Sequence, residues 1–116
     1  MNAFTIEDRI IGPGNRVFVI AEIGVNHDGS LRRALELVEA ARTAGADAVK
    51  LQVFQADTLV NPTANFAEYQ RDRLVERSPA ERLHRDELPA LDLVRVVAAV
   101  REAQMVPLAT PFSLSD

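Results

Sequence analysis

A single lysine lies inside an apolar segment of this chain. Lys50 falls within Ala48–Phe54, and the remaining 12 of the 13 Lys and Arg side chains are arginines. A buried, unpaired ammonium costs on the order of several kcal/mol, so a strand keeps one where something anionic meets it. Glu22 poses the same problem with the opposite charge in the apolar segment Val17–Gly24. Together the two residues predict a polar pocket for an anionic small molecule.

A strand–helix–strand unit must position these two residues. Residues 17–23 and 48–54 are apolar on both alternating faces, which favours parallel strands that are covered on both sides. The spacing of apolar residues predicts a helix over 31–44, with Ser30 as its N-cap and Gly45 as its C-terminal cap. The unit has the size of a right-handed parallel crossover.

The crossover brings Glu22 and Lys50 to one edge of the sheet. Both strands of such a unit point the same way, so the two residues approach the carboxyl edge, where ligands bind in α/β folds. Strand alternation places Lys50 and Gln52 on one face, and Val49 and Leu51 on the other. We expect the apolar face to pack on helices and the polar face to meet the ligand.

The remaining segments continue the strand–helix alternation. Turn residues predict a short hairpin over 1–16, ahead of the unit described above. Residues 55–87 are polar and irregular, with a short helix possible at 66–75. An amphipathic helix is predicted over 89–104 and a third strand over 105–110. The fold class is therefore α/β, with about three parallel strands and two main helices.

The composition is that of an ordinary globular domain. The chain has 116 residues, of which 47% are hydrophobic and 26% charged, and its net charge is −4. That charge argues against a nucleic-acid or anionic membrane surface as partner. The absence of cysteine excludes a disulfide framework. No signal peptide and no apolar stretch of about 20 residues is present, so we expect a cytoplasmic protein.

Three sequence blocks resemble the sialic acid synthase family, the phosphoenolpyruvate-dependent N-acetylneuraminate synthases and their relatives. They are Ile20–Gly29 (IAEIGVNHDG), Ala44–Gln52 (AGADAVKLQ) and Ala109–Ser113 (ATPFS), in the family's order and at its usual spacings. The resemblance implies a (β/α)8 barrel, a fold that needs about 250 residues. Residues 1–116 are thus expected to be the N-terminal segment of such a barrel, with the barrel part over 17–116.

The resemblance also implies a reaction. Members of the family condense phosphoenolpyruvate with an acetamido sugar, typically N-acetylmannosamine, to give a nonulosonic (sialic-type) acid and phosphate. They use a divalent metal, Mn²⁺ or Mg²⁺, and form homodimers. The histidines that bind the metal in the family fall beyond residue 116, so the resemblance implies no metal ligand in this chain. We expect the chain alone to be inactive.

Individual roles follow from the match. Lys50 would contact the phosphate or carboxylate of phosphoenolpyruvate, Thr110 would contact its phosphate, and Gln52 would line the same pocket. Glu22 would sit beside the reacting carbons as a proton-transfer or water-orienting group. Three further residues fall in the matching blocks and are assigned to substrate binding: Asn26, His27 and Phe112.

Structural alternatives remain for each residue. Glu22 and Lys50 could simply form an ion pair across adjacent strands. Gln52 could satisfy backbone groups, and Thr110 is at home in any strand. His27 could brace its loop through hydrogen bonds. Asn26 could be a turn or cap residue, and Phe112 could be a core residue.

Two other functions are also compatible with the sequence. The first is another phosphoenolpyruvate aldol-type synthase on the same barrel, which would prefer a phosphorylated aldose that lacks an acetamido group. The second is a non-catalytic, truncated half-barrel. The choice among acetamido sugars cannot be made from these residues, because the family's specificity loops fall largely in later segments.

Overall fold

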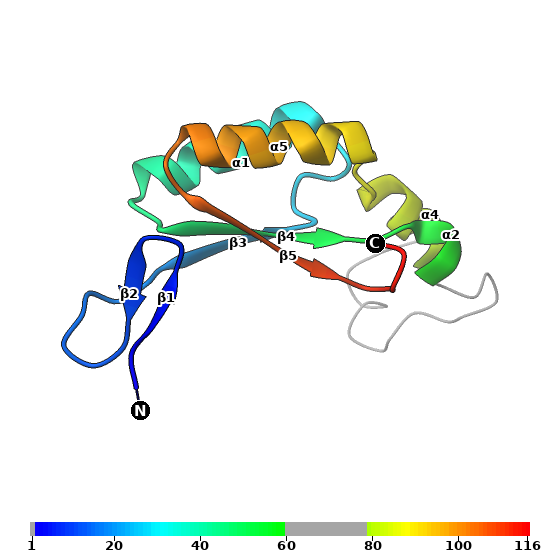
Figure 1. Cartoon of the computed structure of the whole chain (residues 1–116). Coiled ribbons are helices and arrows are strands. Elements are labelled where there is room, and N and C mark those ends of the chain that lie inside the picture. Colours follow the sequence, from blue (N-terminus) through cyan, green and yellow to red (C-terminus); the bar gives the residue numbers. More distant parts are fainter. Residues whose placement is uncertain (1, 60–78) are drawn as a thin grey trace, which may run out of the picture.

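A computed structural model describes residues 2–59 and 79–116 (Figure 1). In chain order the elements are β1 (Phe4–Ile6), β2 (Arg9–Ile11), β3 (Ile20–Gly24), α1 (Leu31–Thr43), β4 (Ala48–Val53), α2 (Ala56–Leu59), α4 (Pro79–Asp86), α5 (Ala90–Glu102) and β5 (Val106–Pro111). β1 and β2 form an antiparallel hairpin, and the three remaining strands form a parallel sheet. The predicted hairpin and α/β class are confirmed. None of the helices within the described ranges is long and apolar enough to cross a membrane.

The parallel sheet has the order β3–β4–β5, with β4 in the centre. Glu22 in β3 lies opposite Lys50 in β4, and Gln52 lies opposite Thr110 in β5. Opposed residues in adjacent strands project to the same face, so this register gathers the predicted polar residues on one side of the sheet. Pro107, which cannot donate a backbone hydrogen bond, lies in β5, an outer strand of the described sheet.

The core lies between the other face of the sheet and two helices. α1 and α5 run side by side over this face (Figure 1). Val49 and Leu51 of β4 are completely or almost completely buried there, against Val38 of α1 and Val96 and Val100 of α5. Burying one such side chain stabilises the fold by roughly 1.5–3 kcal/mol. The predicted alternation of β4 is thus confirmed on its apolar side.

The ends of α1 are set by the residues that the sequence suggested. The Ser30 side chain accepts a hydrogen bond from the Arg33 N–H at 3.2 Å, which satisfies one free donor of the first turn. Gly45 follows the helix with φ +80°, a backbone conformation that favours glycine. The helix predicted over 31–44 is observed at Leu31–Thr43.

The polar face of the sheet is open in the described part of the chain. In the described residues, 39% of the Lys50 side chain and 44% of the Glu22 side chain are exposed. They are exposed because α1 and α5 cover only the opposite face of the sheet. The polar side chains therefore lie on the open face of the described sheet.

The described parts of the segment predicted to be irregular, 55–59 and 79–87, contain two short helices. α2 follows β4 directly, and α4 precedes α5, so both lie near the carboxyl ends of the strands (Figure 1). In α4, Glu81 lies in the first turn and Arg85 in the last, an arrangement that suits the helix dipole. The helix suggested at 66–75 falls outside the described residues.

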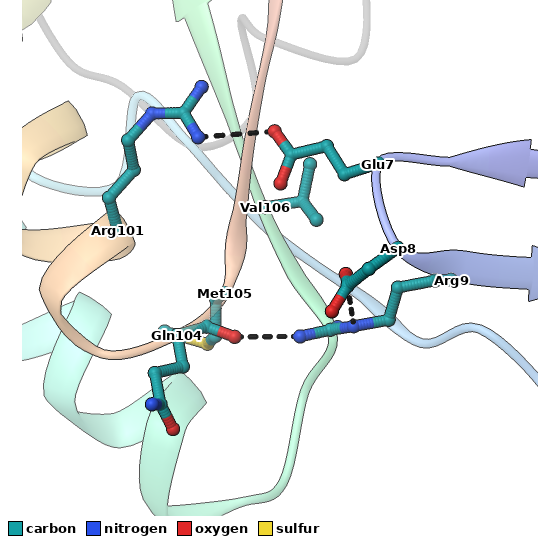
Figure 2. Close-up of a pocket in the computed structure, with 7 residues that line it drawn as sticks. All are labelled: Glu7, Asp8, Arg9, Arg101, Gln104, Met105 and Val106. Carbon is teal, nitrogen blue, oxygen red and sulfur yellow. Dashed lines mark hydrogen bonds and ion pairs between the residues drawn. The ribbon is translucent and has the colours of Figure 1, made fainter.

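The hairpin is fastened to the amino ends of the strands by charged residues. Arg9 donates to the backbone carbonyl of Asp47 at 3.0 Å. It also donates to the backbone carbonyl of Gln104 at 2.7 Å, as Figure 2 shows. Asp47 is buried and accepts from the Val19 N–H at 2.8 Å. Its carboxylate also pairs with Arg9 and with Arg16. Asp47, which lies just before β4, thus connects the hairpin and the segment before β3 to the sheet.

The buried Asp47 carboxylate makes stability sensitive to acid. The hydrogen bond from Val19 lowers the pKa of Asp47 below its ordinary 3.8, helped by Arg16 and Arg9 and opposed by burial. A lowered carboxyl pKa stabilises the fold above the unfolded value, and this stabilisation is lost as pH falls through the folded value. We expect the urea concentration at the unfolding midpoint of the 116-residue chain to decrease as the pH is lowered from about 5 to about 2. Asp47→Asn should lower stability at neutral pH by about 1–3 kcal/mol and flatten this decline. An unchanged acid limb in Asp47→Asn would contradict the assignment.

Candidate functional site

The site begins with an ion pair across two neighbouring strands. The Nζ of Lys50 lies 3.3 Å from Oε2 of Glu22, and the two residues are directly opposed in the β3–β4 register. Both side chains remain partly exposed on the open face. A partly solvated pair of this kind contributes little to stability, typically 0.2–1 kcal/mol. The pair is of chemical interest because it places an ammonium and a carboxylate side by side where a ligand can reach both.

A β-bulge shapes the end of β3. Glu22 pairs with Lys50 and Gly24 pairs with the next residue of β4, Leu51, so Ile23 is an extra residue in the ladder. Gly24 has φ +50°, and a Cβ at this position would lie 3.2 Å from Oε1 of Glu22 and 3.4 Å from Nε2 of Gln52. The carboxylate and the amide therefore converge over this glycine. No role was predicted for Gly24 from the sequence, although this glycine lies in the first block that resembles the sialic acid synthase family.

Thr110 lies near the carboxyl end of β5, and Phe112 follows directly after this strand. Thr110 is partly buried and lies opposite Gln52, one step beyond Lys50 along the strands. Phe112 is 45% exposed, and its ring centroid lies 6.1 Å from that of Phe54 at a tilt of 51°. Along the strands toward the carboxyl edge, the charged pair Glu22–Lys50 is therefore followed by the neutral donors Gln52 and Thr110, and then by the aromatic pair Phe54–Phe112.

The loop after β3 contains Asn26 and His27 in different surroundings. Asn26 is exposed, and its backbone N–H donates to the Ile23 carbonyl at 2.9 Å. His27 is fully buried, and its Nδ1 accepts from the Gly29 N–H at 3.0 Å. Burial lowers the pKa of His27 below its ordinary 6.5, although Asp86, Asp28 and the Gly24 carbonyl act in the opposite direction. The ring is therefore neutral at neutral pH.

Gly29 seats this loop against the chain segment between α4 and α5. It has φ +73°, and a Cβ there would overlap the Arg85 carbonyl oxygen and lie 3.2 Å from the Glu87 carbonyl oxygen. Gly29→Ala should destabilise the 116-residue chain by about 3 kcal/mol, from backbone strain and overpacking combined. Urea unfolding followed by circular dichroism measures this loss.

Gly45 provides a matched control for Gly29. It has φ +80°, and no atom lies within 4 Å of the position that its Cβ would occupy. Gly45→Ala therefore carries the backbone strain alone and should cost about 1–2 kcal/mol. Equal losses in the two variants would show that the close approach of Gly29 to Arg85 and Glu87 is absent in solution.

The described residues do not fit a divalent metal site. Across 2–59 and 79–116, no group of three or more His, Cys, Asp or Glu side chains lies together as a potential metal site. Nδ1 of His27 is occupied by the Gly29 N–H, and Nε2 of His84 lies 2.9 Å from Oδ1 of Asp57. No chemical step is therefore assigned to a metal held by these residues.

A cavity of about 510 Å³ lies at the opposite end of the sheet, between the hairpin turn and the α5–β5 connection (Figure 2). Its charged walls are already paired: Arg101 contacts Glu7 at 3.1 Å, and Arg9 holds the Gln104 carbonyl. The polar side chains predicted for the ligand are not among its lining residues. The candidate site is thus the open face near the carboxyl edge, and this cavity is separate from it.

Sequence comparison places this arrangement in a family. A sequence model of the NeuB family matches residues 37–116, more than half of the chain. The chain belongs to the NeuB family. The match includes both β4, with Lys50 and Gln52, and β5, with Thr110.

Relatives of known name agree with the NeuB assignment. N,N'-diacetyllegionaminic acid synthase of Legionella pneumophila is 57% identical over 67 residues, which are 58% of this chain and 19% of the relative. Spore coat polysaccharide biosynthesis protein SpsE of Bacillus subtilis is 38% identical over 117 residues, which are 95% of this chain and 29% of the relative. The chain thus spans less than a third of the length of either relative.

A solved structure supports the fold over nearly the whole chain. The N-acetylneuraminic acid synthetase of Leptospira borgpetersenii, crystallised with citrate, superposes with a TM-score of 0.75 at 25% identity. The superposition covers 98% of this chain and 35% of that protein. The three-stranded sheet and its helices therefore correspond to part of the TIM barrel of this NeuB-family structure.

Proposed function

We propose that this chain contributes the first part of a NeuB-family synthase. The enzyme would condense phosphoenolpyruvate with an N-acetylated aldose, giving a nonulosonic acid and phosphate. The observation that supports this proposal is the convergence of Glu22, Lys50 and Gln52 on the open face of a sheet. The names of the Legionella and Leptospira relatives supply the class of product, an acid of the legionaminic or N-acetylneuraminic type.

The polar face has groups that suit the phosphate ester. Lys50 offers a point charge for the phosphate or carboxylate, and Gln52 and Thr110 offer neutral donors beside it. These three side chains share one face of adjacent strands, so one anion can meet them together. A closed pocket would strengthen this attraction, because charge–charge energies rise as the local dielectric constant falls.

Glu22 supplies a carboxylate next to the reacting carbons. Carbon 3 of the enol forms a bond to the aldehyde carbon of the sugar, and the aldehyde oxygen takes up a proton. Water then adds at carbon 2, losing a proton, and the C–O bond to phosphate breaks to leave the keto acid. Glu22 would orient the water or move its proton while Lys50, whose Nζ lies 3.3 Å from Oε2 of Glu22, holds the anion.

A chimera tests the proposal. This chain would replace the equivalent segment of the Legionella pneumophila synthase, with the unmodified synthase as positive control. We expect phosphate release from phosphoenolpyruvate only when an acetamido aldose is also present, with Mn²⁺ or Mg²⁺ in the buffer. The sugar panel would include N-acetylmannosamine, and mass spectrometry would identify the nonulosonic acid.

The outcomes of this assay separate the candidate functions. Sugar-independent phosphate release at the same rate would contradict the proposal. A preference for a phosphorylated aldose without an acetamido group would instead favour another aldol-type synthase. A folded chimera without activity, beside an active Legionella control, would favour a non-catalytic role for this chain.

A further inference from the structure

Gly24 lies where β3 ends and the chain turns away from the sheet. The Asn26 N–H donates to the Ile23 carbonyl at 2.9 Å and closes a turn in which Gly24 is the second residue. Gly24 has φ +50°, and a positive φ at the second position of a turn favours glycine. The backbone therefore gives one reason for a glycine at this position, and the side chains beside it give another.

The backbone at Gly24 is anchored by the core. Ile23, the extra residue of the bulge, is 5% exposed and belongs to the core cluster. Leu51, which pairs with Gly24 in the β3–β4 register, is 1% exposed and belongs to the same cluster. A side chain added at Gly24 would therefore meet a main chain that is fixed on both strands, so the side-chain atoms around it must move instead.

The atoms around this position are the ends of two candidate site residues. A Cβ at Gly24 would lie 3.2 Å from Oε1 of Glu22, and 3.4 Å from Nε2 and 3.7 Å from Cδ of Gln52. Both side chains are long and are only partly buried. Their ends can move aside at a small cost in stability, because they do not pack in the core.

The two oxygens of the Glu22 carboxylate have different neighbours. Oε2 lies 3.3 Å from Nζ of Lys50, and Oε1 is the oxygen beside Gly24. A methyl group that presses on Oε1 would turn the carboxylate, and this rotation would also move Oε2 relative to the ammonium. The missing side chain at Gly24 therefore leaves room for the carboxylate to keep its place next to Lys50.

We propose that Gly24 is a positioning residue of the candidate site, whose missing side chain lets the Glu22 carboxylate and the Gln52 amide converge beside Lys50. This inference rests on the proposed function, because it deepens the account of that same site. Gly24 acts through the orientation of Glu22, the group assigned to the reacting carbons. An added methyl group would displace its neighbours by a few tenths of an ångström, and misplacement on this scale lowers the rate of a chemical step.

Stability should distinguish three glycines that all have a positive φ, Gly24, Gly29 and Gly45. An added Cβ meets backbone carbonyls at Gly29, side-chain ends at Gly24, and nothing within 4 Å at Gly45. In urea unfolding of the 116-residue chain, Gly24→Ala should lower the midpoint about as much as Gly45→Ala, and less than Gly29→Ala. A larger loss in Gly24→Ala than in Gly29→Ala would overturn the proposal, because the neighbours of Gly24 would then not be movable side chains.

Activity should separate Gly24 from Gly45. In the Legionella chimera, Gly24→Ala should lower kcat about tenfold, because the Glu22 carboxylate leaves its position for the chemical step. KM for phosphoenolpyruvate should change less than about threefold, because Lys50 is not among the atoms nearest to the added methyl group. Gly45→Ala introduces similar backbone strain and should keep kcat within about twofold. Equal kcat in the two variants would overturn the proposal.

A double variant tests whether Gly24 acts through Glu22. Glu22→Gln already removes the carboxylate, so the addition of Gly24→Ala should lower kcat less than about twofold further. Independent effects would multiply instead. The full loss of about tenfold in the Glu22→Gln background would therefore show that Gly24 acts on the fold and not through the carboxylate.

A measurement without catalysis separates this inference from the proposed function. One α-hydrogen of Gly24 points along the Cβ direction, toward Nε2 of Gln52. NMR of the isotope-labelled 116-residue chain should therefore show a nuclear Overhauser effect between this hydrogen and the side-chain amide protons of Gln52. Absence of the effect would overturn the role of Gly24, whatever the chimera does. An inactive unsubstituted chimera with the effect present would count against the proposed function alone.

Discussion

Replacing Lys50 by methionine in the Legionella chimera should lower kcat/KM for phosphoenolpyruvate by about 10³-fold. Methionine keeps much of the length of the side chain and removes the charge, so the loss reports the ammonium itself. No other lysine is available in the chain to replace it. Removal of one preorganised electrostatic partner in an active site typically costs 10²–10³-fold, and Lys50 also binds the ground-state anion. Steady-state kinetics with varied phosphoenolpyruvate measure the effect.

Two control variants give the Lys50 result its meaning. Arg32 is an exposed cation on α1, paired with Glu36 at 3.3 Å, and Arg32→Met should change kcat/KM less than twofold. Lys50→Arg keeps the charge but changes its shape and reach, so it should recover only part of the activity. A Lys50→Met chimera with the activity of the Arg32→Met control would contradict the assignment of the anion site.

Replacing Glu22 by glutamine should lower kcat by about 10²–10³-fold and leave KM for phosphoenolpyruvate within about threefold. Glutamine has nearly the same shape but cannot accept a proton, and general acid–base groups contribute typically 10²–10⁴-fold. The expected split arises because Glu22 is assigned to the chemical step, whereas Lys50 is assigned to the anion. Rapid-quench measurement of a single turnover would show whether the chemical step is the one that slows.

A matched carboxylate on the outer surface controls for charge. Glu36 is exposed on α1, one turn after Arg32, and Glu36→Gln removes the same charge far from the polar face. Its kcat should equal that of the unsubstituted chimera. If Glu22→Gln raised KM and spared kcat, Glu22 would be a binding group or a structural partner of Lys50 instead.

The local pattern of the sequence predicted much of the sheet. Alternation in β4 separated Val49 and Leu51, which are buried, from Lys50 and Gln52, which are not. These features depend on strand periodicity, which residue type records directly. Ser30 likewise marked the start of α1, because N-cap chemistry is local.

Features that depend on long-range contacts escaped prediction. The partial exposure of Lys50 depends on which faces of the sheet the helices cover, and the apolar neighbours of Lys50 in the sequence do not record this. The bulge at Ile23 depends on the register of β3 against β4, which no single strand encodes. The close approach of Gly29 to Arg85 and Glu87 joins segments far apart in the sequence. The candidate site was thus proposed from residue types and spacing, whereas the contacts around it are visible only in the structure.

Calorimetric titration of phosphoenolpyruvate tests the central claim most directly, because it separates binding from chemistry. In the Legionella chimera, Lys50→Met should raise the dissociation constant for phosphoenolpyruvate by about 100-fold or more, since one desolvated charge contact is worth about 2–5 kcal/mol. Glu22→Gln should bind as tightly as the unsubstituted chimera or more tightly, because it removes a negative charge beside the anion. Equal affinity in Lys50→Met and the unsubstituted chimera would contradict the claim that the Lys50 ammonium holds the anion.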